Sequence, residues 1–389
     1  MKIAMVTPEF LSWGGIGSYT MQLAKHLPSE FEMHLICLNG DQDNCSLSVH
    51  SLGDAQDTFF CNGQFQYRLW RSFKRLQEDN QFDLIHANHA QMPDILMKLG
   101  QERIPSITTV HSTIGSQRLG TKKSSVPLER LERSERMTYA LLPFLSTAEK
   151  FYLKRSANLI FVSEYIRNWC IDKMQIGQES EVIPNGIDTE TFSKKKYEEA
   201  IVHFPQLADK EDIVLFSGRM IALKGIETAL LAKKELAEKA CFVFAGNGDL
   251  SRWQEYSSEL GLHSKDCIFL GPVNYEEMPY LYSLASVFIL PSYSESLPLT
   301  ILEAMSCSTP VVASNVGGVS EIIQNEKDAI LVNSGDSHEL ATAISRLLDN
   351  DNFAKNIKLN ARAKILDKFN AETMAKNTAQ AYIKAIEGS

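Results

Sequence analysis

The sequence lacks three features that mark common classes of protein. Its apolar runs are far shorter than the ~18 residues that a membrane-spanning helix needs. The first apolar run ends at Thr7 and Pro8, too early for the core of a signal peptide. The seven cysteines are odd in number and form no Cys-x-x-Cys pair, which predicts neither a zinc site nor a disulfide framework. We therefore expect a reducing, cytoplasmic setting.

An excess of basic residues is also missing. The chain has 39 Lys and Arg against 48 Asp and Glu, and this balance argues against a nucleic-acid-binding protein, which needs a basic surface. With 44% hydrophobic and 22% charged residues, the composition is that of an ordinary soluble globular protein. The length of 389 residues suits two domains of about 150 to 200 residues each.

Short apolar runs alternate with amphipathic stretches of helical length, most regularly in the second half. The predicted strands there are 213–218, 241–246, 267–271, 287–291, 310–314 and 329–332. Because these runs are apolar throughout, they predict strands buried on both faces, in a doubly wound parallel sheet with helical crossovers. The first half repeats the pattern in the runs 2–7, 32–37, 82–87, 105–111 and 157–163. Residues 118–155 interrupt it with a long charged segment, predicted to be helical from Pro127.

A domain boundary is predicted near residues 182–199, where an apolar run gives way to turn residues and then to charge. We expect a Rossmann-like domain over 1–190 and a second one over 191–371. A last helix, about 372–389, can pack back on the first domain. Ligands bind at the carboxyl ends of the strands in such sheets, so a cleft between the two carboxyl edges is expected.

The segment ESLPLTILE, residues 295–303, places two glutamates in an apolar stretch. A helix is expected over roughly 298–307, with apolar neighbours around Glu303. That carboxylate is costly to bury unless something hydrogen-bonds to it. A ribose diol of a ligand and a neighbouring loop are both candidate donors, and the spacing does not decide between them. The N–H groups at the start of this helix favour an anion such as phosphate.

Two cations follow the run 213–218. Arg219 and Lys224 lie between Gly218 and Gly225, at what should be a carboxyl edge of the sheet. This placement suits a diphosphate, and two solvated surface cations are the alternative.

The first half offers two further candidates. Gly14 and Gly15 precede a predicted helix and let a ligand approach the backbone closely, although the pattern is not Gly-x-Gly-x-x-Gly. His111 closes the run 105–111 and should lie at the carboxyl edge, with a purely structural histidine as the alternative.

Together these motifs resemble the large family of retaining glycosyltransferases with the GT-B fold (group 1, family 4 type), which use nucleotide-diphosphate sugars. The resemblance spans almost the whole chain, in the family's order, through GGIG, His111, VIPNGID, GRMIALKG, AGNGD and ESLPLTILEAMSCSTPVVASNVGGVSEII. One departure is visible. Many relatives have Phe-Gly where this chain has Leu297 and Pro298, and Pro298 has no N–H to donate.

The resemblance implies roles for individual residues. His111 would lie beside the reacting sugar, Glu295 would contact the transferred sugar, and Glu303 would accept hydrogen bonds from the donor ribose. The other implied donor-binding positions are Arg219 and Lys224 at the diphosphate, Gly15 approaching it from the other domain, the main chain near Val273 at the base, and the main chain around Leu297 to Leu299 at the phosphates.

No metal or other cofactor is expected, because two cations and a helix N-terminus can stabilise the charge on a departing diphosphate. Asp-x-Asp, by which another glycosyltransferase fold holds manganese, occurs at 41–43 and 349–351, and we interpret both copies as chance. No side chain is placed as an obvious covalent nucleophile. The resemblance therefore implies a front-side route with retention, in which the departing diphosphate draws the acceptor proton.

The expected reaction moves a hexosyl-type sugar, with UDP slightly preferred over GDP on family frequency, to a hydroxyl of a sugar, lipid-linked or small-molecule acceptor. A non-catalytic relative that binds a sugar nucleotide and a sugar-nucleotide epimerase of similar fold are the alternatives. A dehydrogenase is disfavoured because its glycine pattern fails. The sequence does not reveal the base, the sugar, the acceptor, the linkage or the oligomeric state.

Charges of both signs alternate over residues 118–136, which usually indicates a solvated helix face. Peripheral contact with the inner face of the membrane stays open, since many relatives act on lipid-linked acceptors.

Overall fold

The computed structural model describes residues 1–10, 14–40, 47–53, 61–89, 92–99, 104–124, 126–127, 131–177 and 180–388. Its internal contacts divide the chain into two compact units. Unit 1 consists of Met1–Gly115, Leu141–Gly186 and Ala371–Ser389, and unit 2 of Ser116–Ala140 and Ile187–Asn370. The domain division expected from the sequence stays a prediction, and the two units differ from it at residues 116–140, at 187–190 and at 371.

Unit 1 is built on a seven-stranded parallel sheet in the order β5-β3-β1-β6-β7-β8-β9. Its strands are β1 (Lys2–Val6), β3 (Glu32–Cys37), β5 (Ser48–Ser51), β6 (Leu84–His89), β7 (Ser106–Val110), β8 (Asn158–Phe161) and β9 (Ser180–Val182). The short strands β2 (Glu9–Phe10) and β4 (Asn39–Gly40) pair separately. The five strands predicted for this half are confirmed as β1, β3, β6, β7 and β8. The edge strands β5 and β9 were missed because they are short and only half-buried.

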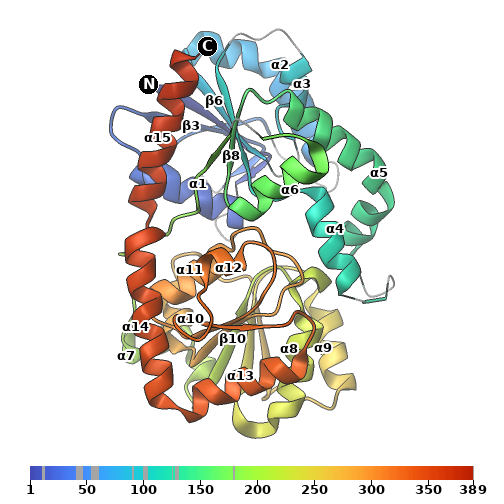
Figure 1. Ribbon diagram of the computed structural model, residues 1–389, viewed down its shortest axis with the longest axis vertical. Helices are drawn as coiled ribbons and strands as arrows, with labels where there is room; N and C mark the ends of the chain where they lie inside the picture. Colours follow the sequence, from blue (N-terminus) through green and yellow to red (C-terminus); the bar gives the residue numbers. More distant parts are fainter. Residues whose placement is uncertain are drawn as a thin grey trace. The chain divides into compact units, whose positions relative to one another are not determined.

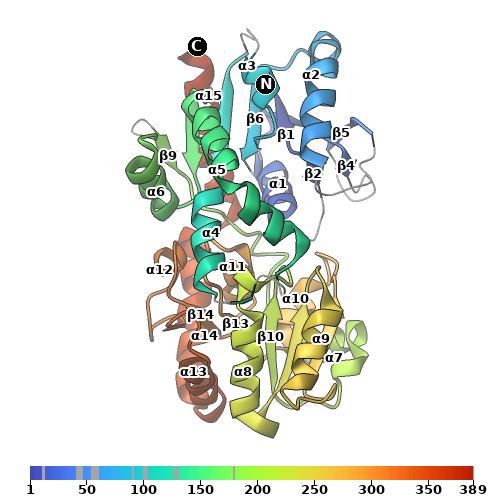
Figure 2. The ribbon, with the colours of Figure 1, turned by 90° about the vertical axis from the view of Figure 1, so that its right-hand side faces the viewer.

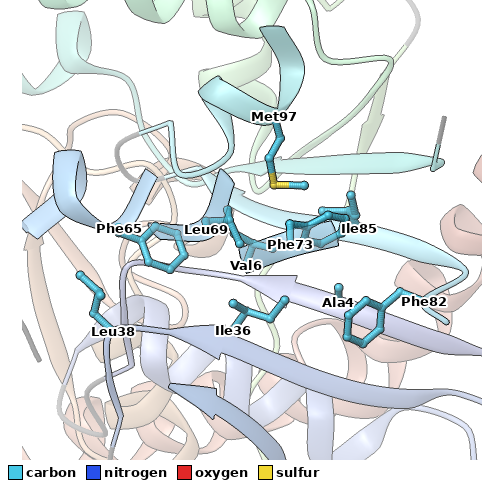
Figure 3. Close-up of a cluster of buried hydrophobic side chains, with 10 residues drawn as sticks. All are labelled: Ala4, Val6, Ile36, Leu38, Phe65, Leu69, Phe73, Phe82, Ile85 and Met97. Carbon is cyan, nitrogen blue, oxygen red and sulfur yellow. The ribbon is translucent and has the colours of Figure 1, made fainter. Parts of the chain in front are cut away.

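The helices of unit 1 cover both faces of this sheet (Figure 1). They are α1 (Gly15–His26), α2 (Cys61–Asn80), α3 (Ile95–Leu99), α6 (Glu164–Met174) and α15 (Ala371–Glu387). Figure 3 shows Phe65, Leu69 and Phe73 of α2 gathered with Ala4 and Val6 of β1 in one buried apolar cluster. Helix α15, from the far end of the sequence, packs against α1.

Two helices have residues in both units. They are α4 (Ile114–Lys123) and α5 (Arg133–Lys154), in the segment that interrupts the strand pattern. The sequence predicted one helix from Pro127, whereas the structure begins α5 at Arg133 and adds α4 before it.

Unit 2 is built on a six-stranded parallel sheet in the order β12-β11-β10-β13-β14-β15. Its strands are β10 (Ile213–Ser217), β11 (Cys241–Ala245), β12 (Cys267–Gly271), β13 (Val287–Leu290), β14 (Val311–Ser314) and β15 (Ile330–Val332). All six predicted strands are confirmed. Every residue of the central β10 is buried, as the uninterrupted apolar run indicated.

The crossovers of unit 2 carry the helices α7 (Tyr197–His203), α8 (Ile226–Leu236), α9 (Leu250–Glu259), α10 (Met278–Leu284), α11 (Leu299–Ser306), α12 (Val319–Ile322), α13 (Ser337–Asp349) and α14 (Asp351–Lys368). Short 3-10 turns lie at Pro205–Leu207, Ala222–Lys224 and Ala237–Lys239. Figure 2 shows α8 and α9 in front of β10. Helix α13 packs on α8, and α11 packs on α10 and α14. Among the described residues, no helix is both long and apolar enough to cross a membrane.

Candidate active site

Two glycines at the carboxyl edge of the sheet lie where the neighbouring backbone leaves no room for a side chain. Gly225 has φ of +73°, and a Cβ on it would lie 1.9 Å from the carbonyl oxygen of Pro291. Gly246, after β11, has φ of +145°, and its Cβ would lie 1.8 Å from the carbonyl oxygen of Gly218. The segments that follow β10, β11 and β13 therefore press against one another at the carboxyl edge of the sheet, where ligands bind in folds of this kind.

This packing brings Lys224 to Glu295. The ammonium Nζ lies 2.6 Å from Oε1 of Glu295, and Ser292 Oγ donates to the same oxygen at 2.7 Å. Only 8% of the Glu295 side chain and 22% of the Lys224 side chain are exposed. A carboxylate so buried needs a charged partner, and Lys224 supplies it. One expected catalytic residue and one expected diphosphate ligand are thus in direct contact.

Arg219 has a different setting. Its side chain is 60% exposed, and its guanidinium lies 3.8 Å from the Glu132 carboxylate, a contact that solvent screens strongly. The carboxylate of Glu135 accepts from the backbone N–H groups of Ala222 and Leu223 at 3.5 and 3.4 Å. The sequence interpretation placed both glutamates on a solvated face and missed these contacts. Glu135 also accepts from the backbone N–H of Glu132 at 3.0 Å, and no sequence pattern links it to residues 222 and 223.

Glu303 lies on α11 among buried apolar neighbours, with 7% of its surface exposed. Burial raises the pKa of Glu303 to about 7, and a hydrogen bond from Tyr282 partly offsets this rise. The hydroxyl of Tyr282, on α10, donates to Oε2 of Glu303 at 2.7 Å. The protein donor is therefore a tyrosine on a helix, rather than the neighbouring loop that the sequence suggested. Tyr282 was missed because it lies on a different helix from Glu303, and sequence spacing does not show which residues of two helices are in contact.

Three main-chain candidates lie in the same unit. Leu297 and Leu299 are buried on either side of Pro298, which is the residue before the first turn of α11. The helix begins at Leu299, one residue later than predicted, so Pro298 lies outside the helical N–H groups. Val273 is half-buried in the segment between β12 and α10.

Gly15 and His111 belong to unit 1. Gly15 is the first residue of α1, and no described atom lies within 4 Å of a Cβ built on it. Packing within the described part of the chain therefore does not require glycine at this position. His111 follows β7, and its Nε2 lies 3.3 Å from Oδ1 of Asn88 on β6. The edge of its ring packs against Tyr19, with the ring centroids 4.6 Å apart.

The described residues contain no group of three or more His, Cys, Asp or Glu side chains that could hold a metal ion. Of the two Asp-x-Asp sequences, residues 41–43 lie outside the described part of the chain. In the other, Asp349 accepts a hydrogen bond from Lys239.

Comparisons with known proteins now place the chain. The family model "Glycosyltransferase Family 4" matches residues 13–191, and "Glycosyl transferases group 1" matches residues 198–364. An uncharacterized glycosyltransferase of Methanocaldococcus jannaschii is 31% identical, over 100% of this chain and 99% of that protein. The chain belongs to this family of glycosyltransferases.

Two further matches are similarly extensive. The UDP-Gal:alpha-D-GlcNAc-diphosphoundecaprenol alpha-1,3-galactosyltransferase of Escherichia coli is 26% identical, over 96% of this chain and 94% of that protein. The solved structure of sucrose-phosphate synthase from Thermosynechococcus elongatus superposes with a TM-score of 0.81 at 24% identity, over 100% of both chains. With its two parallel α/β sheets, the chain has the GT-B fold, and the resemblance seen in the sequence is confirmed.

Proposed function

We propose that this glycosyltransferase moves a hexosyl-type sugar from a nucleotide-diphosphate sugar to an acceptor hydroxyl, with retention of configuration and without a metal. The observation that carries the proposal is the buried contact of Lys224 with Glu295, where the chain turns after β10 and β13. A cation beside a carboxylate offers one group for a phosphate and one for sugar hydroxyls.

Lys224 and Arg219 are the proposed diphosphate ligands. An ammonium group has three N–H donors, so Lys224 can keep its contact with Glu295 while donating to a phosphate oxygen. Breaking the sugar–phosphate bond leaves negative charge on the diphosphate, which fixed cations stabilise without having to reorganise. This supports a reaction that needs no metal. The departing phosphate oxygen then takes the proton of the acceptor hydroxyl on the same face of the sugar.

Glu303 is the proposed ribose ligand. A ribose diol can donate two hydrogen bonds, and hydrogen bonds to a carboxylate favour its charged form. The pKa of Glu303 is raised to about 7 by burial, so donor binding should be coupled to its deprotonation near neutral pH. The main chain near Val273 for the base and that around Leu297 and Leu299 for the phosphates complete the proposed donor site in unit 2. Gly15 and His111 in unit 1 keep their proposed roles at the diphosphate and at the reacting sugar.

UDP is the proposed nucleotide. The Escherichia coli relative at 26% identity is named for UDP-Gal and for an acceptor linked to diphosphoundecaprenol. That name supports a UDP-sugar donor and keeps lipid-linked acceptors among the candidates, beside sugars and small molecules. A cytoplasmic location with peripheral membrane contact stays a prediction. Phe144 on α5 is 75% exposed and is the residue we propose to test for this contact. In a flotation assay with anionic vesicles, Phe144→Ser should reduce the fraction of protein that floats with the vesicles.

The proposal is tested by a thermal-shift panel of UDP-, GDP- and ADP-sugars, with and without EDTA. We expect the largest shift with a UDP-sugar, unchanged by EDTA, and a reduced shift in Glu303→Ala. NMR analysis of the product anomer should then show retention. An inverted anomer would exclude the front-side route. Binding without transfer or donor hydrolysis would favour a non-catalytic relative, and an epimerised donor would favour an epimerase.

A further inference from the structure

The histidine at the end of β7 is held by a chain of hydrogen bonds whose direction is fixed at one end. All members of this chain lie in unit 1: Ile16 and Thr20 on α1, Asn88 on β6, and His111. Thr20 and Asn88 are fully buried, with 0% of their surface exposed. Bulk water therefore does not contact either of these two side chains.

The chain starts at a group that can only accept. The hydroxyl of Thr20 donates to the carbonyl oxygen of Ile16 at 2.9 Å. A hydroxyl has a single hydrogen, so Oγ1 of Thr20 must act as an acceptor towards any other partner. That partner is the side-chain amide of Asn88, at 2.9 Å. The amide must therefore turn its NH₂ group, and not its oxygen, towards Thr20.

This orientation decides what faces the histidine. With the NH₂ group of Asn88 directed at Thr20, Oδ1 is the atom 3.3 Å from Nε2 of His111. An amide oxygen only accepts, so Nε2 of the imidazole must carry a hydrogen. In a neutral ring the lone pair then lies on Nδ1. Edge-on packing against Tyr19, at 4.6 Å between ring centroids, restricts the plane of the same ring.

We propose that Asn88 is a positioning residue that holds His111 as its Nε2–H tautomer. Thr20 and the backbone carbonyl of Ile16 fix the orientation of the Asn88 amide. The inference deepens the proposed function, because it says which nitrogen of the histidine is an acceptor for the sugar hydroxyl. A neutral acceptor nitrogen suits a hydroxyl and disfavours a carboxylate, so the transferred sugar should be a neutral hexose rather than a uronic acid.

The tautomer can be measured without any turnover. In the full-length protein labelled with ¹⁵N-histidine, long-range ¹H–¹⁵N spectra distinguish a protonated ring nitrogen from an unprotonated one, and His111→Gln identifies the signal. We expect Nε2–H in the wild-type protein and a mixture of tautomers in Asn88→Ala and in Thr20→Val. Asn88→Asp keeps an acceptor in place and should keep Nε2–H. The carboxylate of the new side chain should also stabilise the imidazolium form of His111 up to a higher pH. Asn158→Ala is the matched control, since Nδ2 of Asn158 donates to the carbonyl oxygen of Ser106 in the same sheet.

An Nδ1–H tautomer in the wild-type protein, or a His111 spectrum that Asn88→Ala leaves unchanged, overturns the proposal. Thr20→Val and Asn88→Asp preserve side-chain size, so they remain informative if Asn88→Ala does not fold. Transfer assays then separate the two levels of the account. Asn88→Ala should lower kcat by about tenfold or more with little change in donor KM, because it misplaces a group rather than removing a donor contact. A changed tautomer with unchanged kcat leaves the ring assignment standing and contradicts the proposed role of His111.

Discussion

The candidate residues differ in how firmly the protein itself holds them, and the contrast is sharpest between the two glutamates of unit 2 and Gly15 of unit 1. In unit 2, Glu295 is bound by Lys224 and Ser292, and Glu303 is bound by Tyr282. In unit 1, Gly15 opens a helix with no described atom within 4 Å of the space a side chain would fill. Residues of the first kind contribute to folding as well as to the ligand binding proposed for them. Substituting a residue of the second kind should affect ligand binding without lowering the stability of the fold. The following variants separate the two cases.

Gly225→Ala should have the largest effect, a loss of stability above about 4 kcal/mol or failure to fold. Its Cβ would lie 1.9 Å from the carbonyl oxygen of Pro291, at φ of +73°. Gly261→Ala is the matched control, with φ of +79° and no described atom within 4 Å of its Cβ. It should cost only about 1–2 kcal/mol for the left-handed backbone. Thermal unfolding of the two variants makes the comparison, and equal losses would mean that the close approach to Pro291 is not decisive.

Lys224→Ala should lower stability by about 3 kcal/mol and abolish transfer, because it leaves the Glu295 carboxylate, 8% exposed, without its cation. Arg219→Ala, which changes a side chain that is 60% exposed, should alter stability by less than about 0.5 kcal/mol and weaken donor binding. Denaturant unfolding and donor KM check both. Lys224→Met combined with Glu295→Gln should recover stability without recovering activity. Recovery of both would remove the catalytic assignment.

The protonation of Glu303 should appear as pH dependence in two opposite senses. Its pKa is raised from 4.5 to about 7, so the folded protein holds a proton that the unfolded chain has released in this window. Its contribution to stability therefore falls as pH rises from about 4.5 to about 7. Nucleotide affinity should instead rise over the upper part of the window, because the carboxylate accepts the ribose hydrogen bonds. The measurement is the difference between wild type and Glu303→Gln, since Glu149 in unit 1 also has a pKa raised to about 7 by burial. Parallel pH profiles for the two proteins would contradict the assignment.

Gly15→Ala should not destabilise the protein and should raise its stability by up to about 1 kcal/mol, because alanine favours the first turn of α1 and meets no described atom. Donor KM should nevertheless rise if the backbone there approaches a diphosphate. Unchanged kinetics would remove Gly15 from the site, and a large loss of stability would show that the fold requires this glycine.

The sequence predicted most of the fold because buried parallel strands carry a strong local signal. The six apolar runs of unit 2 match β10 to β15 to within one or two residues. Helix α11 begins at Leu299, one residue after the predicted start at 298. The short edge strand β5 and the break between α4 and α5 carry no such signal. Their positions depend on contacts that local periodicity does not describe.

For the candidate site too, the sequence indicated residues that carry a local signal and did not indicate their tertiary contacts. Lys224 and Glu295 were both named from their own segments, and the contact between them arises from the packing of two loops through Gly225. Tyr282 and Asn88 were not named, and Glu135 was assigned to a solvated face, because each contacts a residue distant in sequence. Sequence spacing cannot predict a partner that is linked to the site only by a tertiary hydrogen bond.

The central claim, that the Glu303 carboxylate binds the ribose diol, is tested most directly by calorimetric titration of wild type and Glu303→Ala with UDP and with 2′,3′-dideoxy-UDP. The wild-type protein should bind UDP at least about tenfold more tightly than the dideoxy analogue, a difference of about 1.4 kcal/mol. In Glu303→Ala the two ligands should bind equally. A preference for UDP that persists undiminished in Glu303→Ala would show that the ribose lies elsewhere and contradict the account.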